Sequence, residues 1–466
     1  MNSLIIFKNN LRVKDNPPLF YGSKDNKVIP VFIYDNVNIK KELGSASKYW
    51  LYHALNSLNE SLNSNLLFYK GDSKSIIKSL VKKHSISSVF CEEPFLENDI
   101  ILFEKIKKIL DDLNVSLKFY NSTLLWEPYS ILKDDESPYR VFTPFYRKGC
   151  LGRLNPKYPL GDCEEIDFLD LSNDTKIDDL ELLDEYKWYD KFEALWNISE
   201  NSALNILHEF LHGPISNYKT GRDFPSSNYN SRLSPFIRFG MISINRIWWE
   251  VNKLTSDKNV EHYKSELGWR EFSYYLMYHF PQMESENLQS KFDDFEWDNS
   301  LDKFEAWKKG ETGFPIIDAG MKELWETGYM HNRIRMVVAS FLVKNLSIDW
   351  KLGESWFWDC LLDADFASNI AGWQWVAGTG ADAAPYFRIF NPILQGEKFD
   401  KQGLYVKKWV PELERVPNKF IHKPWEMETK YQEAIKTKIG SDYPSPIVVH
   451  EEARNAALKA FQTLKN

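Results

Sequence analysis

The sequence predicts an α/β N-terminal domain of Rossmann-like type with a parallel sheet, followed by a larger all-α domain. Two observations support this fold class. Over the first 130 residues, apolar runs of strand length alternate with helical stretches, which is typical of βαβ units. From about residue 196 onward, the strand pattern ends and helical periodicity continues. The chain of 466 residues is long enough for two or three domains.

The elements of the N-terminal part follow from its apolar runs. No GxGxxG motif follows the first run, so the pattern does not support a standard dinucleotide site there. The expected strands are Leu4–Phe7, Val28–Tyr34, Leu66–Tyr69, Ser88–Phe90 and Leu117–Tyr120, and the expected helices are Ala46–Asn59, Ser73–His84 and Leu102–Leu113.

A strongly acidic segment separates the two parts. Between residues 162 and 185, eleven positions are Asp or Glu, and Lys176 is the one cation. Such a run is usually a solvated linker, and it would repel phosphate. We therefore predict an α/β domain at 1–130, an acidic interdomain linker at 131–195 and an all-helical domain at 196–466. Helices are expected there at Ser243–Leu254, Ser265–His279, Ile316–Glu326 and Asn332–Lys344.

Composition sets further bounds. The net charge of −8 argues mildly against a nucleic-acid binder, although a sum over the chain does not exclude a local basic groove. The four cysteines form no CxxC pair, which fits reduced thiols and argues against a zinc or iron–sulfur site. No apolar stretch reaches the roughly 18 residues of a membrane helix. The first residues lack the features of a secretory signal, so we expect a cytoplasmic protein.

Two helical segments mix charged, amide and apolar groups on one face. Glu266, Trp269 and Arg270 lie at positions i, i+3 and i+4, where they could hold a flat polar ligand. A surface Glu–Arg pair beside a core tryptophan explains the same pattern. The helix after His331 repeats this mixture. The side chains that share its face are Asn332, Arg335 and Met336, of which the amide can pair with a base edge.

Acceptor groups gather at Asp363-x-Asp365, with Asn369 four residues later. One interpretation is hydrogen bonding to a polar ring system, with Arg335 as the charge partner. The other is a divalent metal site, which we favour less because no third ligand follows at an obvious spacing. The run Gly372–Gly380 then places two tryptophans beside small residues. Small residues next to large rings permit the close approach of a flat ligand or an unpaired base.

Taken together, these segments resemble the cryptochrome/photolyase family, and most of all the class I cyclobutane-dimer photolyases of bacteria. The resemblance covers nearly the whole chain. It implies an N-terminal antenna domain and a helical domain that holds FAD. The segments that carry it are Asn10–Arg12, Asp15–Pro17, Gly221–Pro225, Asn230–Pro235, Trp269–Phe272, Met330–Met336 and Trp373–Asp400.

The resemblance also implies the residues that hold the cofactor. Asn230 stands where the family usually has Thr, and Tyr263 stands where it often has Trp. A cation and polar groups around the ring would stabilise the reduced anionic flavin. The residues expected to bind FAD are Tyr218, Asn230, Ser231, Arg232, Leu233, Ser234, Tyr263, Arg270, Arg335, Asp363, Asp365 and Asn369, the last of them near flavin N5.

The activity implied is that of a deoxyribodipyrimidine photo-lyase, a flavoprotein lyase in which excited reduced FAD passes an electron to a flipped-out cyclobutane pyrimidine dimer in DNA. The dimer would lie among Glu266, Trp269, Asn332, Met336 and Trp375. DNA contacts are expected from Glu266, Arg270, Asn332, Arg333, Arg388, Gln395 and Lys398. Blue light would reduce the flavin through an electron-transfer chain of Trp373, Trp350 and Trp297.

Some alternatives stay open at this point. The stretches Phe7–Leu11 and Leu96–Asn98 depart from the family pattern, so a second, antenna chromophore, methenyltetrahydrofolate or a deazaflavin, is in doubt. Within the family, the rivals are a cryptochrome photoreceptor and a (6-4) photolyase. Asn369, the Asn332 and Met336 pair and the absence of a long tail favour dimer repair. Outside it, a metal-dependent nucleotide-processing enzyme is the rival. We expect a bacterial monomer that is associated with the nucleoid when bound to DNA.

Overall fold

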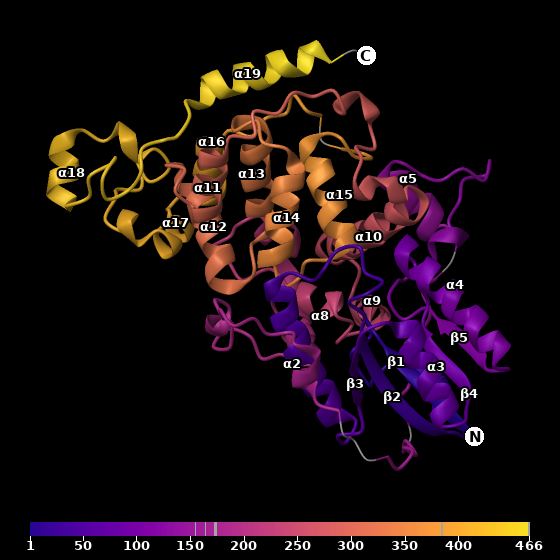
Figure 1. Ribbon diagram of the computed structural model, residues 1–466. Helices are drawn as coiled ribbons and strands as arrows, with labels where there is room; N and C mark the ends of the chain where they lie inside the picture. The colour runs from indigo at the N-terminus through magenta and orange to yellow at the C-terminus, as the bar shows by residue number, and fades with distance from the viewer. Residues whose placement is uncertain (154, 164, 172–174, 384, 465–466) are drawn as a thin grey trace. The chain divides into compact units, whose positions relative to one another are not determined.

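The computed structural model describes residues 1–466 except 154, 164, 172–174, 384 and 465–466 (Figure 1). By compactness the chain divides into two units. Unit 1 comprises Met1–Ser216 and Ser231–Pro281, and unit 2 comprises Asn217–Asn230 and Gln282–Asn466. The domains predicted from the sequence, 1–130, 131–195 and 196–466, divide the chain differently from these two units. Their boundaries remain a prediction.

Unit 1 contains a five-stranded sheet whose strands all pair in parallel, in the order β3-β2-β1-β4-β5 (Figure 1). Its central strands are mostly apolar and buried, as expected of a parallel sheet that is covered on both faces. This confirms the predicted Rossmann-like domain. The strands are β1 (Asn2–Phe7), β2 (Lys27–Tyr34), β3 (Leu67–Lys70), β4 (Ile86–Glu92) and β5 (Ser116–Tyr120).

Helices pack on both faces of this sheet. On one face, apolar side chains of α3 and α4 join those of the strands in a single buried cluster. On the other, α1 approaches closely at Gly22, where an added Cβ would lie 2.2 Å from Ile5 Cδ1. The helices of this region are α1 (Pro17–Gly22), α2 (Ser45–Ser61), α3 (Ser73–Lys83) and α4 (Glu97–Asp112).

The acidic segment was predicted to be a solvated linker, but part of it packs along the sheet. Its backbone pairs with β2, since Val28 N–H donates to Asp167 O at 2.8 Å and Leu169 N–H donates to Val28 O at 3.0 Å. Farther on, Thr175 Oγ1 accepts from Phe68 N–H of β3 at 3.0 Å. Leucines interspersed among the acids allow this packing. Residues 164 and 172–174 of the segment lie outside the described residues.

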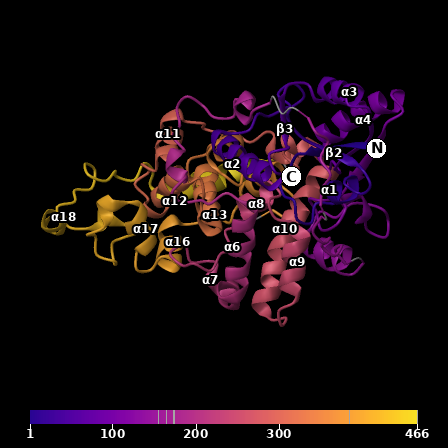
Figure 2. The same cartoon turned by 90° about the horizontal axis from the view of Figure 1, so that it is seen from below.

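The remaining helices of unit 1 include the one that carries Glu266 and Trp269. The sequence predicted this helix from residue 265, but it begins at Lys258, because the Asp257 side chain caps it by accepting from Asn259 and Val260 N–H. Figure 2 shows this helix beside α9, from which it continues after a short turn. The helices are α5 (Phe142–Pro144), α6 (Glu200–His212), α8 (Ser234–Arg238), α9 (Ile244–Asn252) and α10 (Lys258–His279).

Unit 2 is helical, as predicted, and among its described residues extended pairing is limited to one bridge, Ile439 with Tyr443. The helix expected over 332–344 ends at Ser340, and a π-helical turn, Phe341–Asn345, continues it. Its helices are α7 (Tyr218–Gly221), α11 (Leu301–Lys309), α12 (Pro315–Thr327), α13 (Asn332–Ser340), α14 (Trp350–Cys360), α15 (Phe366–Ala377), α16 (Pro392–Phe399), α17 (Leu404–Trp409), α18 (Thr429–Ile435) and α19 (His450–Thr463).

Helices α12, α13 and α14 stand side by side in unit 2, and α15 packs against α13 and α14 (Figure 1). This group carries Arg335 and Asn369, and Asp363 and Asp365 lie in the connection between α14 and α15. Within the described part of the chain, no helix combines the length and apolar character needed to cross a membrane.

Candidate active site

In unit 1, α10 presents Trp269 as a fixed, partly exposed ring. Trp269 stacks on Phe142, with ring centroids 3.9 Å apart and an interplanar angle of 12°. Glu266, one turn earlier, is also partly exposed, and its Oε1 lies 3.8 Å from His262 Nε2. The predicted shared face of Glu266 and Trp269 is therefore present. A stacked wall with a carboxylate beside it suits a flat ligand that carries hydrogen-bonding groups.

The surroundings of Arg270 differ from those of Glu266 and Trp269. Its Nη1 donates to Thr123 O at 2.9 Å and to Glu271 Oε1 at 3.0 Å. Burial raises the pKa of Glu271 to about 7, against the opposing effect of Arg270 and of the N–H groups of Leu125 and Trp126. These contacts tie α10 to the 123–126 loop and favour a structural role. The assignment of Arg270 to FAD or DNA stays a prediction.

The segment expected to hold the FAD phosphates contains a strained residue. Arg232 has φ +55°, a left-handed conformation that costs a non-glycine residue about 1–3 kcal/mol. Its guanidinium lies 4.5 Å from the centre of the Trp196 ring. The Ser231 side chain shares a hydrogen bond with Tyr263, and burial raises the pKa of Tyr263 to about 12. Such over-determined backbone is typical of ligand-binding turns. Leu233 and Ser234 continue this turn into α8, while Tyr218 and Asn230 belong to unit 2.

In unit 2, the predicted charge pair is present. Arg335 Nη2 lies 2.9 Å from Asp363 Oδ2, and Arg335 Nε donates to Met330 O at 2.7 Å. Asp365 instead caps α15, because its side chain accepts from Ser368 N–H at 2.8 Å. The two carboxylates thus have separate partners. The described residues contain no group of three His, Cys, Asp or Glu side chains arranged to hold a metal ion.

Asn369 is oriented by a residue that the sequence analysis missed. Its Nδ2 donates twice to Glu354, to the backbone oxygen at 3.0 Å and to Oε1 at 2.8 Å. Both amide hydrogens are thereby used, so the carbonyl oxygen is presented as an acceptor. Reduced flavin carries a donor at N5, which this oxygen fits. Three residues later, Gly372 is exposed, and an added Cβ there would meet no heavy atom within 4 Å.

Helix α13 begins with a buried histidine cap. His331 Nδ1 accepts from Arg333 N–H at 3.2 Å, and burial lowers the pKa of His331 to about 4. Arg333 pairs with Asp223 at 2.7 Å and packs over the Phe399 ring. Asn332 is exposed and Met336 partly exposed, so both can contact a ligand. The DNA contact expected of Arg333 would have to compete with Asp223 and stays a prediction.

The tryptophans of the predicted electron chain lie at different depths. Trp373 is buried, and its ring centroid lies 5.0 Å from Phe357 and 6.3 Å from Trp307, which the sequence analysis did not single out. Trp350 is buried, and its Nε1 donates to Asn287 Oδ1 at 3.0 Å. Trp297 is partly exposed and lies 4.3 Å from Phe295. The step from burial to exposure suits a path to solvent.

Gln374, between Trp373 and Trp375, is buried. Its Nε2 donates to Met283 O and to Glu286 O, each at 2.9 Å, and these bonds hold the turn at 283–288. Trp375 is partly exposed, so the two tryptophans face different surroundings.

Farther along, Arg388 and Lys398 are exposed and Gln395 is partly exposed. Within the described ranges, neither cation pairs with a carboxylate, which leaves both available to an anionic ligand.

Comparisons with known proteins cover both parts of the chain. Residues 3–160 match the DNA photolyase family model, and residues 263–463 match the FAD-binding domain of DNA photolyase. The deoxyribodipyrimidine photo-lyase of Agrobacterium fabrum is 39% identical over 471 residues, which cover 99% of this chain and 98% of the relative. Cryptochrome-2 of Arabidopsis thaliana is 32% identical, over 98% of this chain and 78% of the relative.

A crystal structure of a bacterial class III photolyase from Agrobacterium tumefaciens shares the fold. It superposes with a TM-score of 0.95 at 38% identity, covering 99% of this chain and 97% of that one. Identity of this extent over the full length, together with matches to both family models, does not arise from a shared fold alone. The chain belongs to the photolyase/cryptochrome family.

Proposed function

We propose that this protein is a light-driven DNA repair enzyme that splits cyclobutane pyrimidine dimers. The observation that carries the proposal is the orientation of Asn369 by Glu354, which presents an amide oxygen where the family places flavin N5. The full-length similarity to a deoxyribodipyrimidine photo-lyase supports it.

Bound FAD would supply the absorption of blue light and the electron that enters the dimer. The chain's own residues hold the cofactor and set its charge. The guanidinium of Arg335, paired with Asp363, would lie at the ring and stabilise negative charge there. The turn Ser231–Ser234 would hold the phosphates and ribityl chain, with Tyr263 behind it. Tyr218, Asn230 and Asp365 complete the proposed set.

Contacts to the lesion are proposed for residues of α10. Trp269, fixed by Phe142, offers a flat wall, and Glu266 beside it can hydrogen-bond the base edges. Asn332, Met336 and Trp375 are proposed as further residues that contact the lesion. A dimer already stacks and pairs poorly, so flipping it out of the duplex costs little. Arg388, Gln395 and Lys398 are proposed to contact the DNA backbone.

The subclass and the alternatives are finer points. The resemblance indicated class I, whereas the class III structure described above favours class III for this chain. A cryptochrome photoreceptor is the second candidate, favoured by the similarity to cryptochrome-2. Against it stands Asn369, since cryptochromes of plants and animals typically carry Asp or Cys there. We further propose a cytoplasmic monomer whose antenna chromophore, if any, binds the α/β domain.

The test is repair of a thymine dimer in a short oligonucleotide by the purified, reduced protein. Blue light should restore intact thymines, and a dark control should not. Bound flavin without repair of this lesion would overturn the proposal and direct the same assay to a (6-4) photoproduct. Activity in the dark that chelators abolish would point instead to a metal-dependent enzyme.

A further inference from the structure

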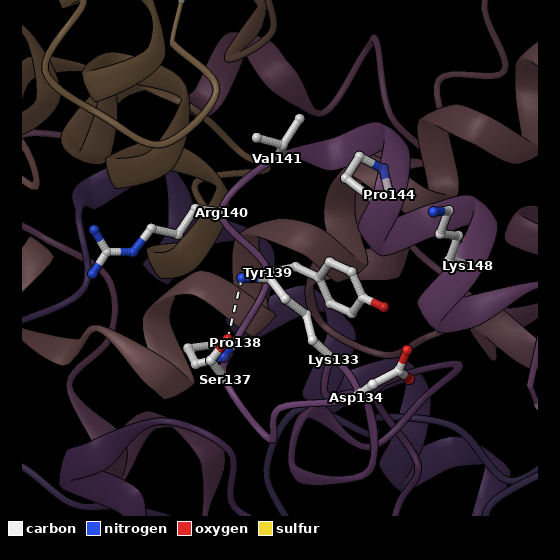
Figure 3. Close-up of a pocket in the computed structure, with 9 residues that line it drawn as sticks. All are labelled: Lys133, Asp134, Ser137, Pro138, Tyr139, Arg140, Val141, Pro144 and Lys148. Atoms are coloured by element: carbon white, nitrogen blue, oxygen red, sulfur yellow. Dashed lines mark hydrogen bonds between the residues drawn. The ribbon is translucent and has the colours of Figure 1, made fainter.

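A pocket in unit 1 is not used by the proposed function. It encloses about 530 Å³ and is formed by the segment that leads into α5 and the turn that follows it. Figure 3 shows the residues around it, with Tyr139 near the centre. Its lining includes Lys133, Asp134, Ser137, Tyr139, Arg140 and Lys148, so one carboxylate lies among the cations.

The segment around this pocket has an acidic start, Asp134–Glu136, and a basic continuation. From Pro138 to Arg153 the sequence contains four cations, Arg140, Arg147, Lys148 and Arg153, and no acid, whereas the whole chain has a net charge of −8. Arg153 pairs with Asp134 at 3.0 Å. Over the ranges that the structure describes, the other three cations have no carboxylate partner, and all three are exposed. Their charge is therefore available to an anionic partner.

The backbone around these cations is held in place. Tyr139 N–H donates to Tyr275 Oη at 2.9 Å, and the Tyr275 hydroxyl donates to Ile131 O at 2.8 Å. The Arg140 guanidinium lies 4.7 Å from the centre of the Phe280 ring. Lys133 Nζ donates to Ser137 Oγ at 3.2 Å. Figure 3 shows Lys133 and Arg140 on one side of the Tyr139 ring and Lys148 on the other, so the positive charges flank an ordered surface.

The segment around the pocket is joined to one wall of the proposed lesion site through a buried ring. Phe142, two residues after Arg140, is the ring on which Trp269 stacks. The segment from Lys133 to Lys148, Phe142 and Trp269 all belong to unit 1. A strand that places a dimer against Trp269 would therefore run toward the basic segment.

We infer that this pocket is a phosphate subsite, in which Arg140 and Lys148 hold the backbone of the strand that carries the lesion. The inference rests on the proposed function. Several exposed cations spread along one segment suit a polyanion, because each can neutralise a separate phosphate. A small anion would be expected to have buried donors that converge on one point.

The test is the salt dependence of binding. A double variant, Arg140→Gln with Lys148→Gln, is titrated with a dimer-containing duplex labelled for fluorescence anisotropy, in the dark. We expect the affinity to fall about tenfold at moderate salt and the slope of log K against log[salt] to drop by about two, as for the loss of two phosphate contacts. FAD content should equal that of the wild type. Arg140→Lys with Lys148→Arg should restore the slope.

The matched control is Lys82→Gln with Lys83→Gln, which removes the same charge from the exposed end of α3. A wild-type salt slope in the pocket variant, or an equal loss in the control, overturns the inference even if the wild type repairs dimers. Wild-type DNA binding with loss of a bound near-ultraviolet chromophore also overturns it and assigns the pocket to a small molecule. A reduced slope in a protein that never repairs supports the subsite and refutes the proposed function.

Discussion

At the scale of single residues, the orientation of Asn369 depends on Glu354, and this can be tested. Glu354→Leu removes the Oε1 acceptor, which lies 2.8 Å from Asn369 Nδ2. The amide can then turn, so we expect an altered flavin absorption spectrum, slower repair and a stability loss of about 1 kcal/mol. Flavin spectra, repair rates under blue light and denaturant unfolding measure the three effects.

The control is Glu354→Gln, which keeps an oxygen acceptor at the same place and should stay close to the wild type. If the Leu and Gln variants show the same altered spectrum, repair rate and stability, these effects come from the loss of the Glu354 carboxylate. They would then not come from the orientation of Asn369.

These residues also show the limits of sequence reasoning at this scale. The Arg335 and Asp363 pair could be predicted, because two opposite charges stood among segments that resembled one site. Glu354 could not, since it lies on α14 and reaches Asn369 of α15 only in the folded chain. The role of His331 could not be predicted either, because the sequence does not show whether a histidine is a buried helix cap or an exposed side chain. Arg270 was placed in the site by spacing, but spacing does not reveal Thr123 as its partner.

At the scale of elements, the packing of α14 against α15 depends on Gly353. A Cβ added there would lie 2.2 Å from Trp373 Cη2 and 2.5 Å from Leu342 Cδ2. Gly353→Ala must therefore push α14 away from the indole or turn the ring. We expect a loss of about 1–3 kcal/mol in stability, as for other overpacked cores. If Trp373 passes electrons to the flavin, photoreduction should slow as well.

Thermal unfolding and the rate of flavin photoreduction measure these effects. Trp373→Phe serves as the comparison, because it stops the electron path without crowding the helix. Normal photoreduction in both variants would contradict the electron-transfer role of Trp373, while unchanged stability of Gly353→Ala would contradict the tight packing.

Element boundaries could be predicted to within a few residues where a cap or an apolar run marks them. The errors have local causes. Helix α10 begins early because Asp257 caps it, and α13 gives way to a π-helical turn after Ser340, which leaves the apolar spacing almost unchanged. The acidic segment was misjudged because its charges outnumber the leucines through which it packs.

At the scale of the whole molecule, the fold class could be predicted, because the change from strand to helix spacing extends over hundreds of residues. The division into two compact units could not. The segment 217–230 belongs with unit 2, although the chain on either side of it belongs with unit 1. Periodicity describes each element alone and does not tell which distant elements share a core.

Two buried groups of unit 2 contribute to the pH dependence of stability in opposite directions. Burial lowers the pKa of His331 to about 4, from 6.5, and raises the pKa of Asp318 to about 6, from 3.8. Between pH 6.5 and 4, the unfolded histidine binds a proton that folded His331 does not, so its contribution to stability is lost as pH falls. Folded Asp318 binds a proton before the unfolded carboxyl does, so its contribution grows over the same range.

Each effect amounts to about 3 kcal/mol at most, because one pKa unit corresponds to about 1.4 kcal/mol. They largely cancel in the wild type. His331→Asn keeps an oxygen that can cap α13 but does not titrate. Relative to the wild type, its free energy of unfolding should therefore rise by up to about 3 kcal/mol between pH 7 and 4. Urea unfolding at pH 7, 5.5 and 4.5 measures this difference, with the exposed His208→Asn as the control. A difference that stays constant with pH would show that folded His331 titrates like an exposed histidine, in conflict with its burial.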